Sequence, residues 1–339
     1  MIKPILAIPM GDAAGIGPEI TVKAMADDSV HNMARLVVVG DRKVLEQAQE
    51  FSKVKLTINC INDPQHGNFE PGVLNLIDLD NIDMNQLKIG AVQAMTGKAA
   101  YEYIEAATRL CLEKKADVLT TTAINKESLK AAKVPYIGHT EIVGALTHTK
   151  NPLTMFQVHN LRVFFLSRHV SLKQACDLVT RENLTVFIDQ SVAALKILGV
   201  KNPRLAIAGL NPHSGEHGLF GMEEVEGVMP AVADARKRGI SIDGPIGADS
   251  VFHFALKGKY DGVLSLYHDQ GHIATKMVDF EKTISITIGM PILRTSVDHG
   301  TALDIAGKGI ASPVSLIEAI RLGAEYAPFF NQHSEAVSN

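Results

Sequence analysis

Short apolar runs rich in β-branched residues alternate along this chain with longer segments in which apolar residues recur every three or four positions. The first pattern is typical of buried strands and the second of amphipathic helices. Strands are predicted at residues 5–8, 36–39, 118–121, 163–166, 205–208, 263–266 and 284–288. Helices are predicted at residues 19–25, 98–114, 172–198, 224–237 and 314–327. This alternation predicts an α/β fold with a largely parallel central sheet.

Composition excludes several classes of function. The 339 residues carry 33 Lys and Arg against 37 Asp and Glu, a formal net charge of -4, so no basic surface for nucleic acid is expected. No apolar run approaches the roughly 20 residues that a membrane-spanning helix needs. The first ten residues lack the pattern of a signal peptide, and the three cysteines lie far apart, so we expect a cytoplasmic protein.

Common cofactor and catalytic motifs are missing. The loop at residues 11–19 follows a predicted strand and precedes a helix, but it is not G-x-G-x-x-G. The chain also lacks the P-loop, H-E-x-x-H and G-x-S-x-G patterns. A standard Rossmann dinucleotide site, a P-loop nucleotidase, a zincin and an α/β-hydrolase are therefore not indicated.

Three histidines follow predicted strands at the point where each strand gives way to a loop: His169, His213 and His268. Ligands of open α/β sheets bind beyond the carboxyl ends of the strands, and three imidazoles suit a divalent ion while leaving a position open for substrate. A single histidine of this kind is more simply a half-buried structural residue, but the repeated placement favours a metal site. His217 and His272 lie four residues further on. Because glycines interrupt both pairs, we expect loops there and structural roles for these two.

Candidate contacts for an acidic substrate also lie near predicted loops. Residues 138–141, with the sequence GHTE, offer an imidazole, a hydroxyl and the amides of a possible helix N-terminus. Lys276 and Arg294 would add positive charge, although Lys276 is equally well explained as a surface lysine. Asp249 is a candidate either for a helix N-cap or for a substrate contact.

Taken together, the segments GDAAGIGPE, GHTE, NPHSGE, YHDQG and RTSVDHGTALDIAGKG resemble the 4-hydroxythreonine-4-phosphate dehydrogenase family, in the family's order and along almost the whole chain. The last segment is also similar to the cofactor loop of isopropylmalate and isocitrate dehydrogenases, which bind NAD without G-x-G-x-x-G. The resemblance implies a two-domain fold like that of those enzymes, with the active site in the interdomain cleft. It implies a discontinuous first α/β domain at residues 1–135 plus 300–339, on the cofactor side. A second α/β domain, at residues 136–299, would hold the metal ligands and the dimer interface.

The resemblance further implies a homodimer with shared active sites and one divalent ion (Zn, Co, Mg or Mn) held by the three histidines, one of them from the partner subunit. The implied catalytic residues are Lys276 and Asp249. The implied substrate contacts are His139, Thr140, Lys276, Ser285 and Arg294. The implied NAD contacts are Gly300, Thr301, Ala302, Asp304 and Gly307.

The implied reaction is oxidation at C3 of a 4-phosphorylated C4 acid by NAD, followed by loss of the carboxylate β to the new ketone. A divalent ion supplies Lewis-acid stabilisation for both steps, and the nicotinamide accepts the hydride. Two other classes stay open: a phosphoryl or acetyl transferase of related fold, which would not need three strand-end histidines, and a metabolite-binding regulator that has lost catalysis. The second would be expected to lack one of the histidines or Lys276, and all four are present.

Two departures from the family pattern concern the substrate. Ser285 stands where an asparagine is expected in the pyridoxine-biosynthesis enzymes, and Ala13 and Ala14 stand where a proline is usual. We therefore expect the catabolic branch that oxidises 4-phospho-D-threonate or 4-phospho-D-erythronate to dihydroxyacetone phosphate. The alternative is 4-hydroxy-L-threonine 4-phosphate dehydrogenase of pyridoxal phosphate biosynthesis, with Ser285 simply facing the sheet.

Overall fold

The computed structural model describes residues 2–338, with side chains to residue 333, and it separates into two compact units. One unit comprises residues up to 152 and those from 284 onward, and the other comprises residues 153–283. The divisions therefore differ from the sequence-based boundaries at 135/136 and 299/300. Pairing of the strand at residues 293–297 with the strand at residues 118–121 keeps residues 284–299 in the first unit.

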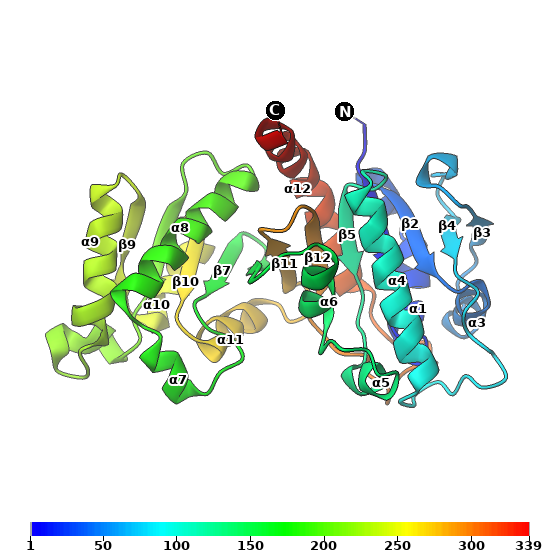
Figure 1. Ribbon diagram of the computed structural model, residues 1–339, viewed down its shortest axis with the longest axis horizontal. Helices are drawn as coiled ribbons and strands as arrows, with labels where there is room; N and C mark the ends of the chain where they lie inside the picture. The colour runs from blue at the N-terminus through cyan, green and yellow to red at the C-terminus, as the bar shows by residue number, and fades with distance from the viewer. Residues whose placement is uncertain (1, 339) are drawn as a thin grey trace. The chain divides into compact units, whose positions relative to one another are not determined.

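The first unit is built around strands in the order β3-β4-β2-β1-β5-β12-β11, all parallel except that β11 runs antiparallel to β12 (Figure 1). Its strands are β1 (Ile5–Pro9), β2 (Arg35–Gly40), β3 (Thr57–Cys60), β4 (Val73–Asp78), β5 (Val118–Thr121), β11 (Ile284–Ile288) and β12 (Leu293–Val297). Its α-helices are α1 (Gly17–Met25), α2 (Asp28–Met33), α3 (Arg42–Ser52), α4 (Ala94–Leu112), α5 (Lys126–Ala131), α6 (His139–Leu146) and α12 (Val314–Ser338). A short 3₁₀ helix spans Pro64–His66.

The two faces of β12 have different roles. The Thr295 hydroxyl lies 3.0 Å from the Thr120 hydroxyl of β5. A Cβ built on Gly323 of α12 would lie 3.2 Å from the same Thr295 hydroxyl, so this face of β12 packs against α12. Because side chains alternate along a strand, Arg294 and Ser296 project from the opposite face. The strand thus packs α12 with one face and presents polar side chains on the other.

The second unit has strands in the order β6-β7-β10-β8-β9, in which β6 is antiparallel to β7 and the other pairs are parallel (Figure 1). Its strands are β6 (Leu153–Val158), β7 (Leu161–Phe165), β8 (Arg204–Ala208), β9 (Ser241–Ile246) and β10 (Gly262–Ser265). Its α-helices are α7 (Leu172–Asp177), α8 (Arg181–Ile197), α9 (Met229–Lys237), α10 (Ala248–Leu256) and α11 (His268–Val278). A 3₁₀ segment η2 spans Pro212–Gly218, and a π-helical turn η3 spans Glu224–Val228.

The α/β class is confirmed, and each of the seven predicted strands coincides with an observed strand to within a few residues. The single helix predicted at residues 172–198 is wrong, because the Thr180 side chain accepts a hydrogen bond from the Asn183 amide and starts a new helix there. The segment predicted at residues 224–237 begins with the η3 turn before α9. Over residues 2–338, the structure contains no helix that is both long enough and apolar enough to cross a bilayer.

Candidate functional site

The carboxyl ends of four neighbouring parallel strands carry four of the predicted site residues. In the spatial order β7, β10, β8 and β9, the residues that follow these strands are His169, His268, His213 and Asp249. Parallel strands all end at the same edge of a sheet, which is where open α/β folds bind ligands. The second unit therefore presents the three predicted metal ligands along one edge.

His169 and His268 are neighbours, with ring centroids 6.4 Å apart. The Nδ1 atom of His268 donates to Oδ1 of Asp269 at 2.7 Å, which leaves the lone pair of its Nε2 for a ligand bond. A carboxylate in this position is the usual outer partner of a metal-binding histidine, so the donor set fits a divalent ion. Within the described part of the chain, however, no three His, Cys, Asp or Glu side chains form a group that could hold a metal.

Helix α11 carries two more polar groups in line with His268. His268, His272 and Lys276 are spaced four residues apart and share one face of the helix. The prediction of a loop between His268 and His272 is therefore wrong. Gly271 does not break the helix. A glycine is needed there because a Cβ would lie 2.5 Å from the Phe165 ring, which packs against the helix.

His272 is buried against the rings of Phe156 and Phe165, at centroid distances of 4.3 and 4.6 Å. Burial, with smaller contributions from the neighbouring His268 and Lys276, lowers the pKa of His272 to about 3. This imidazole is therefore neutral at physiological pH.

Lys276 and Asp249, two further predicted groups of this unit, lie on α-helices. The Nζ atom of Lys276 stands 4.9 Å from the ring centroid of Phe280, a cation–π contact. Asp249 is exposed and is the second residue of α10, whose N-cap is Gly247. The N-cap alternative for Asp249 is thus wrong.

His213 lies in a segment of unusual backbone. Residues 213–217 have φ values of 52°, 57°, 78°, 43° and 57°, so five consecutive residues adopt the left-handed conformation. For non-glycine residues this conformation costs about 1–2 kcal/mol each. Backbone strain of this kind persists only where surrounding contacts hold it, and it is concentrated at functional sites.

In the first unit, Arg294 forms the centre of a polar cluster. Its side chain is almost fully buried, and Nε and Nη2 donate to the Thr121 hydroxyl at 3.1 and 2.9 Å, while Nη1 donates to the Thr287 hydroxyl at 3.1 Å. Ser285 lies two residues before Thr287 on β11 and so projects from the same face. Ser285 therefore shares the Arg294 face of the sheet.

His139 begins α6, as the sequence indicated for the GHTE segment, and Gly138 is the N-cap. Burial and the nearby Arg294 charge hold its pKa well below the ordinary value, against a hydrogen bond to the backbone of Thr122. Its Nε2 atom is buried and has no hydrogen-bond partner within residues 2–338. A neutral ring with an unused nitrogen therefore lies near a buried guanidinium, and Thr140 follows it as the second residue of the helix.

The predicted NAD-binding segment packs on the loop between β1 and α1. The Ile16 amide donates to the Thr301 carbonyl at 3.0 Å, and a Cβ on Gly15 would lie 2.8 Å from Cβ of Thr301. Further along, Gly307 has φ 74°, and a Cβ there would meet Ile89 at 2.9 Å. Of the other predicted residues here, Gly300 faces open space, Ala302 has φ 40°, and Asp304 is exposed. Thr301 and Gly307 thus hold the segment in place, while the other three leave it accessible.

A fully buried carboxylate that the sequence did not single out supports the same loop. Oδ1 of Asp12 accepts from the Ala14 amide at 2.9 Å, while its Oδ2 has no hydrogen-bond partner among the described residues. Burial raises the pKa of Asp12, and the hydroxyls of Thr96 and Ser128 oppose the shift. The sequence G-D-A-A-G could have indicated that Asp12 is buried, because a carboxylate in a tight glycine loop has few positions open to solvent.

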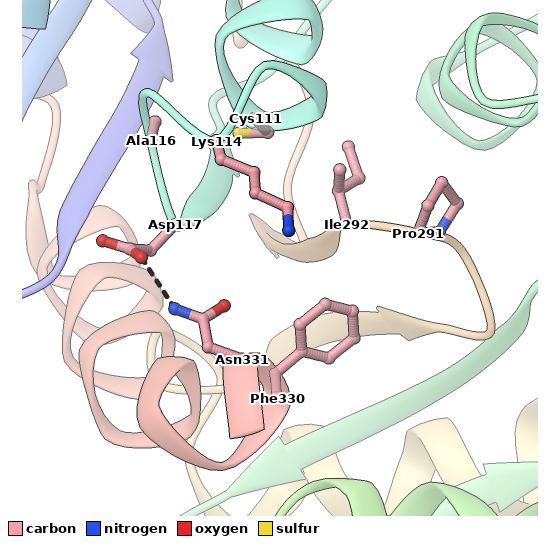
Figure 2. A pocket seen from close by; sticks show the side chains of 8 residues that line it. All are labelled: Cys111, Lys114, Ala116, Asp117, Pro291, Ile292, Phe330 and Asn331. Carbon is pink, nitrogen blue, oxygen red and sulfur yellow. Dashed lines mark hydrogen bonds between the residues drawn. The ribbon is translucent and has the colours of Figure 1, made fainter. Parts of the chain in front are cut away.

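A separate pocket of about 260 Å³ lies where β5 and β12 begin, away from their carboxyl ends. Lys114, Phe330 and Asn331 point into it, and the Asn331 amide donates to Oδ1 of Asp117 at 2.7 Å (Figure 2). None of the residues that line this pocket is a predicted site residue.

Comparisons with known proteins agree on one family. The model of the family described as "Pyridoxal phosphate biosynthetic protein PdxA" matches residues 32–323. A curated relative from Fusobacterium nucleatum, named "Putative D-threonate 4-phosphate dehydrogenase", is 59% identical over 325 residues, covering 96% of this chain and 98% of the relative. A relative of the same name from Halalkalibacterium halodurans is 58% identical over 328 residues, covering 97% and 98%. The crystal structure of 4-hydroxythreonine-4-phosphate dehydrogenase from Klebsiella pneumoniae is 39% identical, with a TM-score of 0.89 and coverage of 96% and 98%.

Proposed function

Because this chain belongs to the PdxA family of dehydrogenases, as its sequence motifs indicated, we propose that it oxidises a 4-phosphorylated C4 hydroxy acid with NAD. The proposed substrate is 4-phospho-D-threonate or 4-phospho-D-erythronate, oxidised at C3 and decarboxylated to dihydroxyacetone phosphate. The relatives named for D-threonate 4-phosphate are 58–59% identical to the chain, which supports this branch. The 4-hydroxythreonine-4-phosphate dehydrogenase structure is more distant, at 39%.

The observation that carries the proposal is the Arg294 cluster. Two threonine hydroxyls hold the guanidinium on the face of the sheet, and a planar guanidinium matches the geometry of a phosphate or carboxylate. His139 is neutral, and its unused Nε2 is suited to accept a hydrogen bond from a substrate hydroxyl. Thr140 and Ser285 would complete the contacts of the first unit.

The second unit contributes the proton chemistry. Lys276 would hold an acidic group of the substrate and return a proton from Nζ to the carbon that loses carbon dioxide. Asp249 is exposed and would exchange protons with the substrate hydroxyl.

A divalent ion held by His169, His213 and His268 would supply Lewis-acid stabilisation of developing negative charge. The nicotinamide of NAD, bound along residues 300–307, would accept the hydride.

The enzyme assay that tests this proposal follows NADH formation with a divalent metal and a panel of 4-phosphorylated C4 acids. We expect the highest kcat/KM with the two hydroxy acids, and carbon dioxide released in equal amount to NADH. Absence of NADH formation with every member of the panel would rule out the proposed reaction.

We further propose a homodimer that completes the metal site. Two findings support it: one chain does not gather three ligands within its described residues, and apolar side chains are exposed on α11 and just beyond its end. Ile273 and Met277 of α11 are 64% and 80% exposed, and Phe280, two residues after the helix, is 64% exposed.

Mixing two inactive variants tests the shared site. His169→Ala and His213→Ala should each bind metal weakly, since two imidazoles cannot replace three. If the ligands come from different chains, mixed dimers of the two variants regain one intact site and part of the activity. Full metal occupancy in either single variant would refute the ligand assignment, and failure of the mixture to recover activity would refute a site in which His169 and His213 come from different chains.

A further inference from the structure

A second buried carboxylate holds the segment that carries His213. Glu224 is fully buried at the start of η3. Its Oε1 accepts from the backbone amides of Leu210 and Asn211, both at 2.7 Å, and its Oε2 accepts from Nδ2 of Asn211 at 2.9 Å. Both carboxylate oxygens are therefore used on two consecutive residues that follow β8.

These bonds lie next to the left-handed segment. Pro212 and His213 directly follow Asn211, and Gly215 lies against the same carboxylate, because a Cβ there would be 2.7 Å from Oε2 of Glu224. A left-handed run that includes His213, Ser214, Glu216 and His217 needs contacts that fix it. Glu224 contacts residues 210 and 211, which directly precede this run, and Gly215 at its centre.

We propose that Glu224 is a positioning residue for the metal ligand His213: it fixes the backbone of residues 210–215 so that the imidazole is presented at the sheet edge. This inference rests on the proposed metal site. The hydrogen bonds of Glu224 go to the amides of Leu210 and Asn211 and to the Asn211 side chain, so it would act through the backbone it holds. Charge-assisted bonds to backbone amides are well suited to this, because they are short and strongly directional.

The test measures the affinity of the metal-free, full-length protein for Co²⁺ by calorimetry and by the visible absorption of the bound ion. Glu224→Ala should weaken Co²⁺ binding about 10- to 100-fold, the range found when outer partners of metal ligands are removed. Glu224→Gln should weaken it less, because the amide oxygen still accepts from both backbone amides while its NH₂ opposes Nδ2 of Asn211. The matched control is Glu226→Gln, an exposed glutamate in the same turn, and it should bind Co²⁺ like the unmodified protein.

Two further measurements separate the possible causes. NAD binding, followed by fluorescence, should be unchanged in Glu224→Gln, whereas a general loss of structure would weaken both ligands. His213→Ala is the reference for a lost ligand: if it binds Co²⁺ normally, the proposed metal site is wrong. If His213→Ala binds weakly but Glu224→Ala binds normally, the positioning role of Glu224 is wrong. Should Glu224→Ala not fold, equal Co²⁺ affinities of Glu224→Gln and Glu226→Gln overturn the proposal.

Discussion

Replacing Arg294 by lysine tests the proposed substrate-binding role of its cluster most directly. The guanidinium makes three hydrogen bonds of 2.9–3.1 Å to hydroxyls on two different strands, from Thr121 of β5 and Thr287 of β11. The lysine ammonium is a single point on a flexible stem, and it cannot reproduce this planar arrangement. The positive charge stays, so the substitution separates geometry from charge.

The size of the effect follows from the lost bonds. An ammonium that contacts a substrate anion can keep at most one of the two threonine contacts. A hydrogen bond to a charged group contributes about 1.5–3 kcal/mol. Losing one such bond corresponds to a fall of roughly 10- to 150-fold in kcat/KM, since about 1.4 kcal/mol is one factor of ten.

The assay compares the catalytic efficiencies of Arg294→Lys and the unmodified enzyme with the preferred phosphorylated acid, together with the thermal unfolding midpoint. The control is Arg42→Lys, an exposed arginine paired with Glu46 on the surface of α3, where little change is expected. A kcat/KM within threefold of the unmodified enzyme would show that the fork geometry of Arg294 does not matter. A fall in kcat/KM that is matched by loss of folded protein would instead assign Arg294 to stability.

Three further outcomes are expected. An unphosphorylated analogue should lose turnover as well as affinity, because binding of the phosphate helps to position C3; equal catalytic efficiency with both compounds would contradict this. Ser285→Asn should shift the preference in a competition assay from the hydroxy acid toward 4-hydroxythreonine 4-phosphate, since an amide reaches further and offers two donors; an unchanged preference would mean that Ser285 does not select the substrate. Asp12→Asn should gain free energy of unfolding relative to the unmodified protein as the pH rises from 4.5 to 7.5, measured by urea denaturation. Burial raises the folded-state pKa of Asp12, so the stability from its protonated form is present below the unfolded pKa and lost as the pH rises through the folded pKa; a pH-independent difference would refute this.

The histidines were accessible from the sequence because a local rule governs them. A polar residue directly after a buried strand lies at the sheet edge wherever the strand is parallel, and β7, β8 and β10 are. The proposed three-histidine metal site does not follow from that rule, because such a site depends on which side chains meet in space.

Other features were hidden because their causes are non-local. Gly271 resembles a helix breaker in the sequence, yet it is glycine because the Phe165 ring of β7 lies against α11. Strand β12 escaped prediction because Arg294 and Ser296 are polar and nevertheless buried. Glu224 gave no signal, since its partners Leu210 and Asn211 belong to the preceding strand end and loop.

The discontinuous first unit also sets an order for the growing chain on the ribosome. Strand β5 pairs with β1 on one edge, but its other partner, β12, is translated only after the whole second unit. Until then β5 has unpaired amide and carbonyl groups along that edge, a template for pairing with other chains. The sheet of the first unit, which is translated first, is thus completed last. A chain that ends before residue 284 would carry a complete second unit attached to an incomplete, aggregation-prone sheet.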